Sequence, residues 1–127
     1  MAKKEFMYRG KTLDEIKRLN LTEFAQLIPA RQRRSLKKGL THSQKVLLES
    51  IKKDKKKLRT QSRDMVIVPA MLDKTIELHS GNEWKRLLIT PYMLGHYLGE
   101  FALTRRRVAH NAPGIGATRS SSNLSVK

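Results

Sequence analysis

The sequence contains no cysteine, which excludes a disulfide framework, a thiolate zinc site and a cysteine nucleophile. Acidic residues are scarce too: 11 Asp and Glu face 27 Lys and Arg, for a formal net charge of +16. No apolar run approaches the roughly 18 residues of a membrane span, and the start, MAKKEF, has no hydrophobic signal core. We therefore expect a cytoplasmic protein with a polyanionic partner and no membrane partner.

Aromatic residues are also few, with one Trp, three Tyr and three Phe. The consensus of RNA-recognition domains, in which paired sheet aromatics stack on bases, is absent. Binding of a nucleic acid should then depend on backbone phosphates and shape more than on base stacking. We expect Trp84 to be a sheet or core residue more than a stacking platform.

Motifs for metal binding, cofactor binding or catalysis are lacking as well. The four histidines, His42, His79, His96 and His110, do not have the spacing of zinc ligands. The segment GIGATR, residues 114–119, lacks the third glycine of a dinucleotide fingerprint and follows no predicted strand. A lysine-bearing phosphate loop and a nucleophile elbow are absent too. We expect no metal, no cofactor and no enzymatic activity.

What the sequence has in abundance is positive charge, and this charge is unevenly spread. Residues 29–63 carry a net charge of +11 and residues 101–127 a net charge of +5. Residues 64–100 carry a net charge of −2 and residues 1–28 a net charge of +2. We interpret the nearly neutral block as the folded centre and the two strongly basic blocks as the surface that meets the partner. The length of 127 residues suits one domain with extensions.

The densest basic cluster is PARQRRSLKKG, residues 29–39, and no acid occurs between Glu23 and Glu49. Such a cluster is either a solvated helix face or a phosphate-binding surface, where arginine forks meet oxygens two at a time. The run KKDKKK, residues 52–57, is as consistent with a solvated helix end as with a phosphate-binding surface. The triplet at residues 105–107 follows an apolar helix end; it is either part of a flexible tail or a group of cations that the core aims outward.

Helix signals dominate the first half of the chain. Thr12 with Glu15 and Thr41 with Gln44 have the spacing of capping boxes. A helix should end near Pro29, and another should span ARQRRSLKK with Pro29 in its first turn and Gly39 at its end.

Strand signals follow in the second half, so the fold class is α+β. We expect a small antiparallel sheet with the N-terminal helices packed on it. Its strands are the β-branched run at 65–68, the segment KTIELH, and EWKRLLI after an SGN turn. One short helix capped by Thr90 should come after the hairpin, with Leu94, Leu98 and Phe101 on its buried stripe. An extended basic tail should follow.

Several of these stretches together resemble a known family. RQRRSLKKGL, LRTQSRDMVIVPAML, TIELHSGNEW and ITPYMLGHYLGEFALTRRRVAH are similar, in this order, to the S-nineteen family of small-subunit ribosomal proteins. The likeness covers about residues 31–119 and is most specific over 80–104. The N-terminal extension and the PGIGATRSS tail resemble the archaeal and eukaryotic branch. The bacterial pattern has Trp where Gln61 stands and Pro where Leu103 stands, so these bacterial details do not carry over.

The resemblance implies a structural protein in the head of the small subunit that binds the 3′ major domain of the ribosomal RNA. It implies a complex with the S-thirteen protein, a position near the bridge to the large subunit, and a tail that approaches the tRNA sites. The chain then divides into an N-terminal helical extension (1–30), an RNA-binding α+β core (31–110) and a flexible basic tail (111–127).

Candidate site residues come from two sources. Carried over onto matching positions, the resemblance implies RNA contacts by Arg34, Lys37, Lys38, Arg59, Arg63, His96 and Arg105. Charge and position add Arg31, Arg33, Arg106, Arg107 and Arg119. The resemblance implies that the tail, and with it Arg119, lies near the tRNA and decoding region.

Composition alone leaves three rival functions open. A general DNA-binding or DNA-compacting protein is the main alternative, and it would bind duplex DNA about as tightly as ribosomal RNA. A membrane-surface protein needs a basic amphipathic helix, which is seen only weakly over 44–57. An enzyme is the least favoured, because the acids of the central block pair with no candidate nucleophile or metal ligand.

Overall fold

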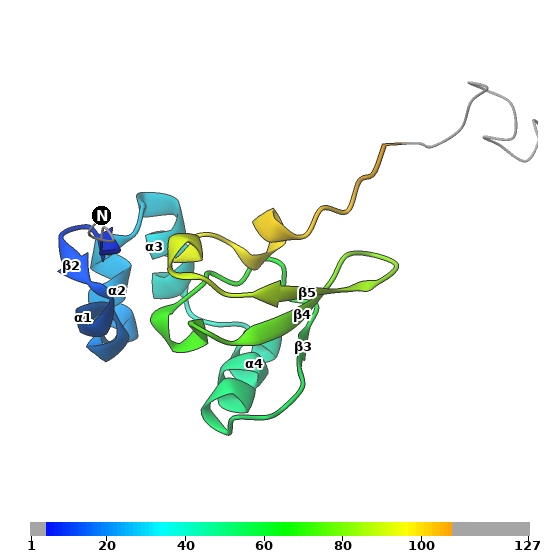
Figure 1. The fold of residues 1–127 in the computed structure, drawn as a ribbon, viewed down its shortest axis with the longest axis horizontal. Coiled ribbons are helices and arrows are strands. Elements are labelled where there is room, and N and C mark those ends of the chain that lie inside the picture. Colours follow the sequence, from blue (N-terminus) through cyan, green and yellow to red (C-terminus); the bar gives the residue numbers. More distant parts are fainter. Residues whose placement is uncertain (1–4, 108–127) are drawn as a thin grey trace, which may run out of the picture.

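The computed structural model describes residues 5–107 and has the α+β class that the sequence predicts (Figure 1). Its helices are α1 (Leu13–Arg18), α2 (Leu21–Leu27), α3 (Ala30–Lys38) and α4 (His42–Lys52). Its strands are β1 (Met7–Tyr8), β2 (Lys11–Thr12), β3 (Leu58–Thr60), β4 (Thr75–His79) and β5 (Trp84–Leu88). Three 3₁₀ turns are η1 (Pro69–Met71), η2 (Pro91–Met93) and η3 (Leu98–Phe101). The tail predicted at 111–127 lies outside the described residues.

The helices of the first half begin and end close to where the sequence predicts. The Thr12 amide donates to Glu15 Oε2 at 2.8 Å and the Thr41 amide donates to Gln44 Oε1 at 3.1 Å, so both predicted capping boxes form. Pro29 is the N-cap of α3 and lies just before its first turn. Gly39 ends α3 with φ of +103°, a value that favours glycine.

The sheet differs from the expected one in its third strand. Strand β4 pairs antiparallel with β5 as the SGN turn predicts, but β3 pairs parallel with β4, so the sheet is mixed. The β-branched run at 65–68 is not a strand of this sheet: its four residues are all at most 2% exposed. It passes through the core and bonds to residues 95–98 instead, for example from the Ile67 amide to His96 O at 2.8 Å. Residues 58–60 alternate buried and exposed, and this pattern suits a sheet with one covered face.

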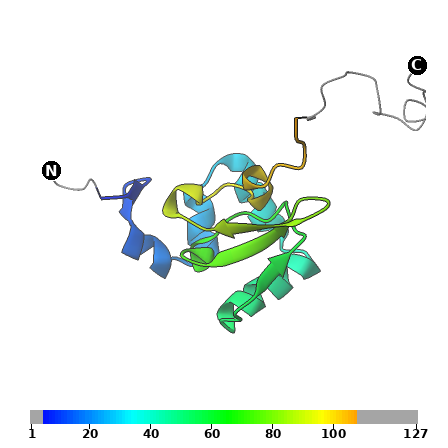
Figure 2. The same cartoon turned by 45° about the vertical axis from the view of Figure 1, so that its right-hand side comes forward.

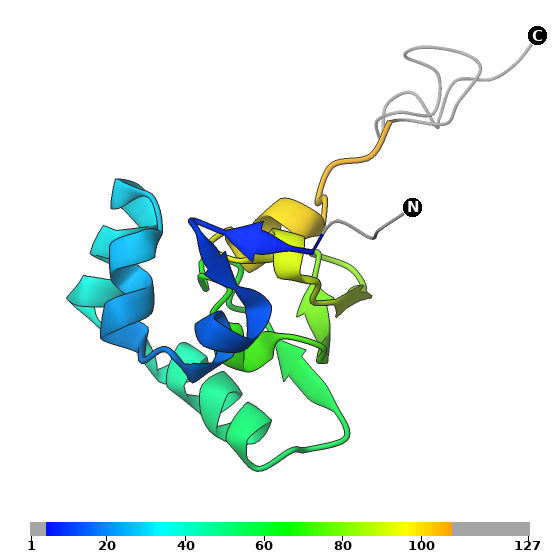
Figure 3. The same cartoon turned by 60° about the vertical axis from the view of Figure 1, so that its left-hand side comes forward.

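The segment after the hairpin forms two 3₁₀ turns, η2 and η3, instead of the single short helix that we expected. Gly95 separates them with φ of +79°, and a Cβ at this position would lie 2.8 Å from the Tyr8 hydroxyl. Figure 3 shows the N-terminal hairpin against this region, where Phe6 packs edge-to-face on Tyr92 at 5.0 Å. The β1–β2 hairpin was not predicted, because its strands are only two residues long.

One hydrophobic cluster holds these elements together. Ile16 and Phe24 of the N-terminal helices belong to the same cluster as Ile76 and Leu78 of β4. Helix α4 covers one face of the sheet (Figure 2) and contributes Leu47 to the cluster. None of the helices in the described range is long and apolar enough to cross a membrane.

The stripe predicted after the hairpin is only partly buried. Leu94 is 2% exposed and Leu98 is fully buried, as predicted, whereas Phe101 is half-buried at the margin of the cluster. Leu98 is therefore the side chain that fixes the second turn to the core.

We expect Leu98→Ala to lower the free energy of unfolding by about 2–5 kcal/mol, because it leaves a cavity beside Met65 and Val66. Leu103→Ala is the matched control, since Leu103 is 70% exposed, and it should change stability by less than about 0.5 kcal/mol. Urea unfolding followed by circular dichroism measures both. Equal stability of the two variants would show that η3 does not depend on the core.

Candidate nucleic-acid interface

Helix α3 presents the densest set of free cations in the described part of the chain. Arg31, Arg34, Lys37 and Lys38 are all exposed, and none of the four forms an ion pair with a described residue. The two lysines occupy the last turn, where positive charge favours the helix dipole. A hollow of about 620 Å³ is lined by Ala30, Arg33, Arg34, Lys37 and Lys38. Four of the five side chains around this hollow are cations, as suits a phosphate group.

Arg33 differs from its neighbours because it is half-buried and bonded within the fold. Its Nε donates to Ala25 O at 3.0 Å, and its Nη2 donates to Gln26 O and Ile28 O at 3.1 Å each. These are carbonyl groups at the C-terminal end of α2, which has no basic residue in its own last turn. Arg33 thus caps α2 and orients α3 against it. The contact of Arg33 with RNA stays a prediction. Because Nε and Nη2 already donate within the protein, this contact would be made by Nη1.

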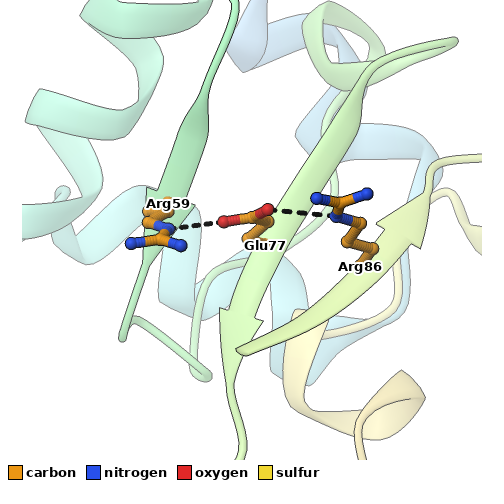
Figure 4. A network of polar contacts seen from close by, with 3 residues as sticks. All are labelled: Arg59, Glu77 and Arg86. Atoms are coloured by element: carbon orange, nitrogen blue, oxygen red, sulfur yellow. Dashed lines mark hydrogen bonds and ion pairs between the residues drawn. The ribbon is translucent and has the colours of Figure 1, made fainter. Parts of the chain in front are cut away.

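The outer face of the sheet carries a second cationic group. Glu77 of β4 accepts from Arg59 Nε of β3 and, at 3.1 Å, from Arg86 Nε of β5 (Figure 4). The hydrogen bond from Arg59 holds the pKa of Glu77 below its ordinary value, although burial acts to raise it. The Arg59 guanidinium also lies 5.0 Å from the centroid of the Trp84 ring. Trp84 lies in the sheet, as we expected, and fixes the direction of Arg59.

Arg63 joins three segments that are distant in the sequence. Its Nη1 donates to His79 O at 3.0 Å, and its Nη2 donates to Gly99 O at 2.9 Å and to Ala102 O. A Cβ on Gly99 would lie 3.0 Å from Arg63 O, so this glycine permits the close approach. Arg63 therefore fixes the end of β4 to η3 and to the point where the chain leaves the core.

The remaining predicted residues lie near this exit. His96 is exposed, and its Nδ1 lies 2.7 Å from Glu100 Oε2. Residues 105–107 continue away from η3 as an extended segment (Figure 1), and all three arginines are exposed. Arg106 bonds Glu83 of the β4–β5 turn, whereas Arg105 and Arg107 form no ion pair with described residues. Arg119 lies outside the described residues.

The structure also brings together residues that the sequence analysis missed. A cleft of about 700 Å³ is lined by residues of α3 and by residues 64–66, and Gln44 and Tyr97 also line it. The sequence did hold one signal: Asp64 is the first acid after nine residues that include five cations. We followed the basic residues and gave this acid no role.

These features describe a small, basic α+β protein whose fold gathers guanidinium and ammonium groups on its surface. Among the described residues, no three His, Asp or Glu side chains converge to hold a metal ion. The family model described as "Ribosomal protein S19" matches residues 34–110, and the chain belongs to this family. Its members are structural proteins of the small ribosomal subunit, and binding of ribosomal RNA is general among them.

Two archaeal relatives are similar over nearly the whole chain. The "Small ribosomal subunit protein uS19" of Methanocella arvoryzae is 49% identical over 125 residues, 98% of this chain and 89% of the relative. The protein of the same name from Picrophilus torridus is 48% identical over 124 residues, 98% of this chain and 82% of the relative. The resemblance inferred from the sequence motifs is therefore confirmed.

The lowered pKa of Glu77 predicts that the free energy of unfolding decreases at acid pH. Because this pKa is lower in the folded than in the unfolded chain, its contribution to stability is present above the ordinary value of 4.5 and is lost as the pH falls through the folded value. We expect the stability difference between wild type and Glu77→Gln to be largest near neutral pH and to shrink below about pH 4. Urea unfolding at stepped pH values measures this difference.

Glu49→Gln serves as the control for this experiment. It removes the same charge from an exposed residue of α4 that forms no ion pair with described residues. The difference between this variant and the wild type should depend much less on pH. If the Glu77→Gln difference stays constant across the acid range, Arg59 and Arg86 do not stabilise the ionised carboxylate.

Proposed function

We propose that this protein binds the ribosomal RNA of the small-subunit head chiefly through phosphate contacts made by α3. The observation that supports this most is the state of α3: four exposed cations on a nine-residue helix, unpaired among the described residues and without an acid on the helix. Cations on a free protein surface that lack a carboxylate partner are available to displace counterions from a nucleic acid. The role is that of a scaffold, not of a catalyst.

The contacts of α3 with the core support a preorganised surface. Arg33 fixes one side of the helix to the end of α2. On another side, Ser35 Oγ lies 3.0 Å from the hydroxyl of Tyr97, which precedes η3. Helix α3 therefore meets its partner with its backbone already positioned, and only the long cationic side chains lose freedom on binding.

A second contact region is the exit of the chain after η3. Arg63 fixes the backbone at Ala102, and Arg105 and Arg107 follow within five residues. The phosphate contacts assigned to these two arginines are therefore made from a segment whose starting point is held by the core. The sheet face with Arg59 and Arg86 adds a third cationic group, of which Glu77 neutralises one charge.

The finer features of this proposal rest on the family resemblance. They are binding to the 3′ major domain, a complex with the S-thirteen protein, and proximity to the bridge with the large subunit. They also include a cytoplasmic location and a tail, with Arg119, that approaches the tRNA sites. A general DNA-binding protein remains the alternative against which RNA binding is tested.

We expect binding to a head-domain RNA fragment to fall steeply with salt. If the four free cations of α3 together with Arg105 and Arg107 each contact a phosphate, the slope of log affinity against log salt is about −4 to −5. A salt titration by filter binding or fluorescence anisotropy measures this slope. A flat response, or equal affinity for a DNA duplex of matched length at one salt concentration, would contradict the proposal.

Two neighbouring arginines of α3 should separate binding from stability. Arg34→Ala should leave the free energy of unfolding nearly unchanged and reduce the magnitude of the salt slope by about 0.7–0.9, because it removes one exposed cation. Arg33→Ala should lower the free energy of unfolding by about 1–3 kcal/mol, because the carbonyl groups at the end of α2 lose their donor. If both variants change the free energy of unfolding by the same amount, Arg33 does not have the structural role that separates it from Arg34.

A further inference from the structure

The cleft beside α3 has a composition that phosphate binding alone does not explain. It measures about 700 Å³, within the usual range of roughly 300–1,000 Å³ for sites that hold a small organic group. Arg31, Arg34 and Lys38 lie along it, as expected for a surface that meets RNA. Its lining also includes an acid, Asp64, and a nearly buried amide, Gln44. Phosphate binding alone gives Asp64 no role, because a carboxylate repels phosphate and Asp64 pairs with none of these cations.

Asp64 is exposed and remains unpaired although three cations line the same cleft. It lines the same cleft as three cations, yet it forms no ion pair within 4.0 Å and no side-chain hydrogen bond among the described residues. An ionised carboxylate only accepts hydrogen bonds, and its two oxygens offer adjacent acceptor sites. The acceptors of Asp64 are therefore free for a ligand that carries adjacent N–H donors.

Gln44 adds a donor to the same cleft. Its side chain is nearly buried, with 6% of the residue exposed, and its Oε1 is already used by the Thr41 amide at 3.1 Å. Its Nε2 forms no hydrogen bond with a described residue. Because the amide oxygen already accepts from Thr41, the amide nitrogen remains to donate to a ligand. The capping box thus determines which end of the Gln44 amide faces the ligand.

The walls of the cleft suit a flat, partly apolar group. Leu36 and Leu40, which are half-buried, provide apolar surface, and Tyr97 provides an aromatic ring. Unpaired bases of RNA are commonly held between such side chains while their Watson–Crick edges are read by hydrogen bonds. The cations along the cleft suit the phosphates on either side of such a base.

We propose that this cleft holds one unpaired guanine of the bound RNA and reads its Watson–Crick edge. In this arrangement Asp64 accepts from the N1–H and 2-amino groups of guanine, and Gln44 Nε2 donates to O6. Adenine presents a donor and an acceptor to the same groups, and uracil and cytosine present an acceptor at the position of the guanine amino group. The set of one donor and two acceptors therefore matches guanine alone among the four bases. This inference rests on the proposed RNA binding and assigns a base to it.

The experiment uses three single-stranded RNA pentamers that differ in one base: UUGUU, UUIUU, in which inosine lacks the 2-amino group, and UUAUU. All carry the same phosphates, so electrostatic attraction is equal and only the base edge varies. Fluorescence anisotropy with the full chain at one salt concentration should show UUGUU bound at least about fivefold more tightly than the other two, the lower end of what one bidentate base contact provides.

Asp64→Asn tests the residue assignment, and Glu49→Gln is its matched control. Each variant removes one negative charge from an exposed position, but only Asp64 lines the cleft. Both variants should bind UUAUU and UUIUU slightly more tightly than the wild type does, because each removes a negative charge, whereas only Asp64→Asn should bind UUGUU more weakly. Only Asp64→Asn should reduce the preference for guanine, to less than roughly twofold.

The inference is overturned if UUGUU binds no better than the other pentamers, including the case in which none binds, or if the preference survives in Asp64→Asn. This failure is distinct from a failure of the proposed function. The head-domain RNA fragment would still bind with its steep salt slope if α3 contacts phosphates and the cleft reads no base. A flat slope with an intact guanine preference would instead retain the cleft and reject the phosphate surface.

Discussion

The fold depends on main-chain carbonyl groups that take the place of carboxylates as partners of buried positive charge. With 27 basic and 11 acidic residues, the chain cannot pair each cation with an acid. Arg33 and Arg63 each donate to three carbonyl oxygens instead, at the end of α2 and around η3. A guanidinium group has five N–H donors in a planar fork, so it can join several carbonyl groups at once. These two side chains hold the N-terminal helices and the chain exit in place.

The same arrangement divides the cations into two functional groups. Arginines whose donors are used inside the protein determine its shape, and cations that the fold leaves unpaired are the ones that we propose as the surface for RNA. Glu77 extends this logic to the sheet, because one nearly buried carboxylate positions Arg59 and Arg86 without neutralising both. The position of each cation in the structure, more than its place in a basic run, therefore indicates its role.

Local signals in the sequence predict the first half of the fold well, since each capping box joins residues only three apart. The third strand could not be found this way. The run at 65–68 has stronger β-propensity than residues 58–60, but burial on all sides removes it from the sheet. The structural roles of Arg33 and Arg63 were hidden for a similar reason. The carbonyl groups that accept from Arg63 lie 16–39 residues away in the sequence. Those that accept from Arg33 belong to the end of the preceding helix. Periodicity and charge counts contain no information on such partners.

Dependence on forked donors has a consequence for how the chain can change over evolution. Lysine carries the same charge as arginine but presents it as a single ammonium group on a flexible stem. At Arg31 and Arg34, where the proposed phosphate contacts need mainly a charge, exchange between the two residue types is physically mild. At Arg33 and Arg63, a lysine cannot span the same carbonyl groups, so an identical charge would no longer bring the segments together. Two positions in a basic sequence are thus constrained by shape, while their neighbours are constrained only by sign.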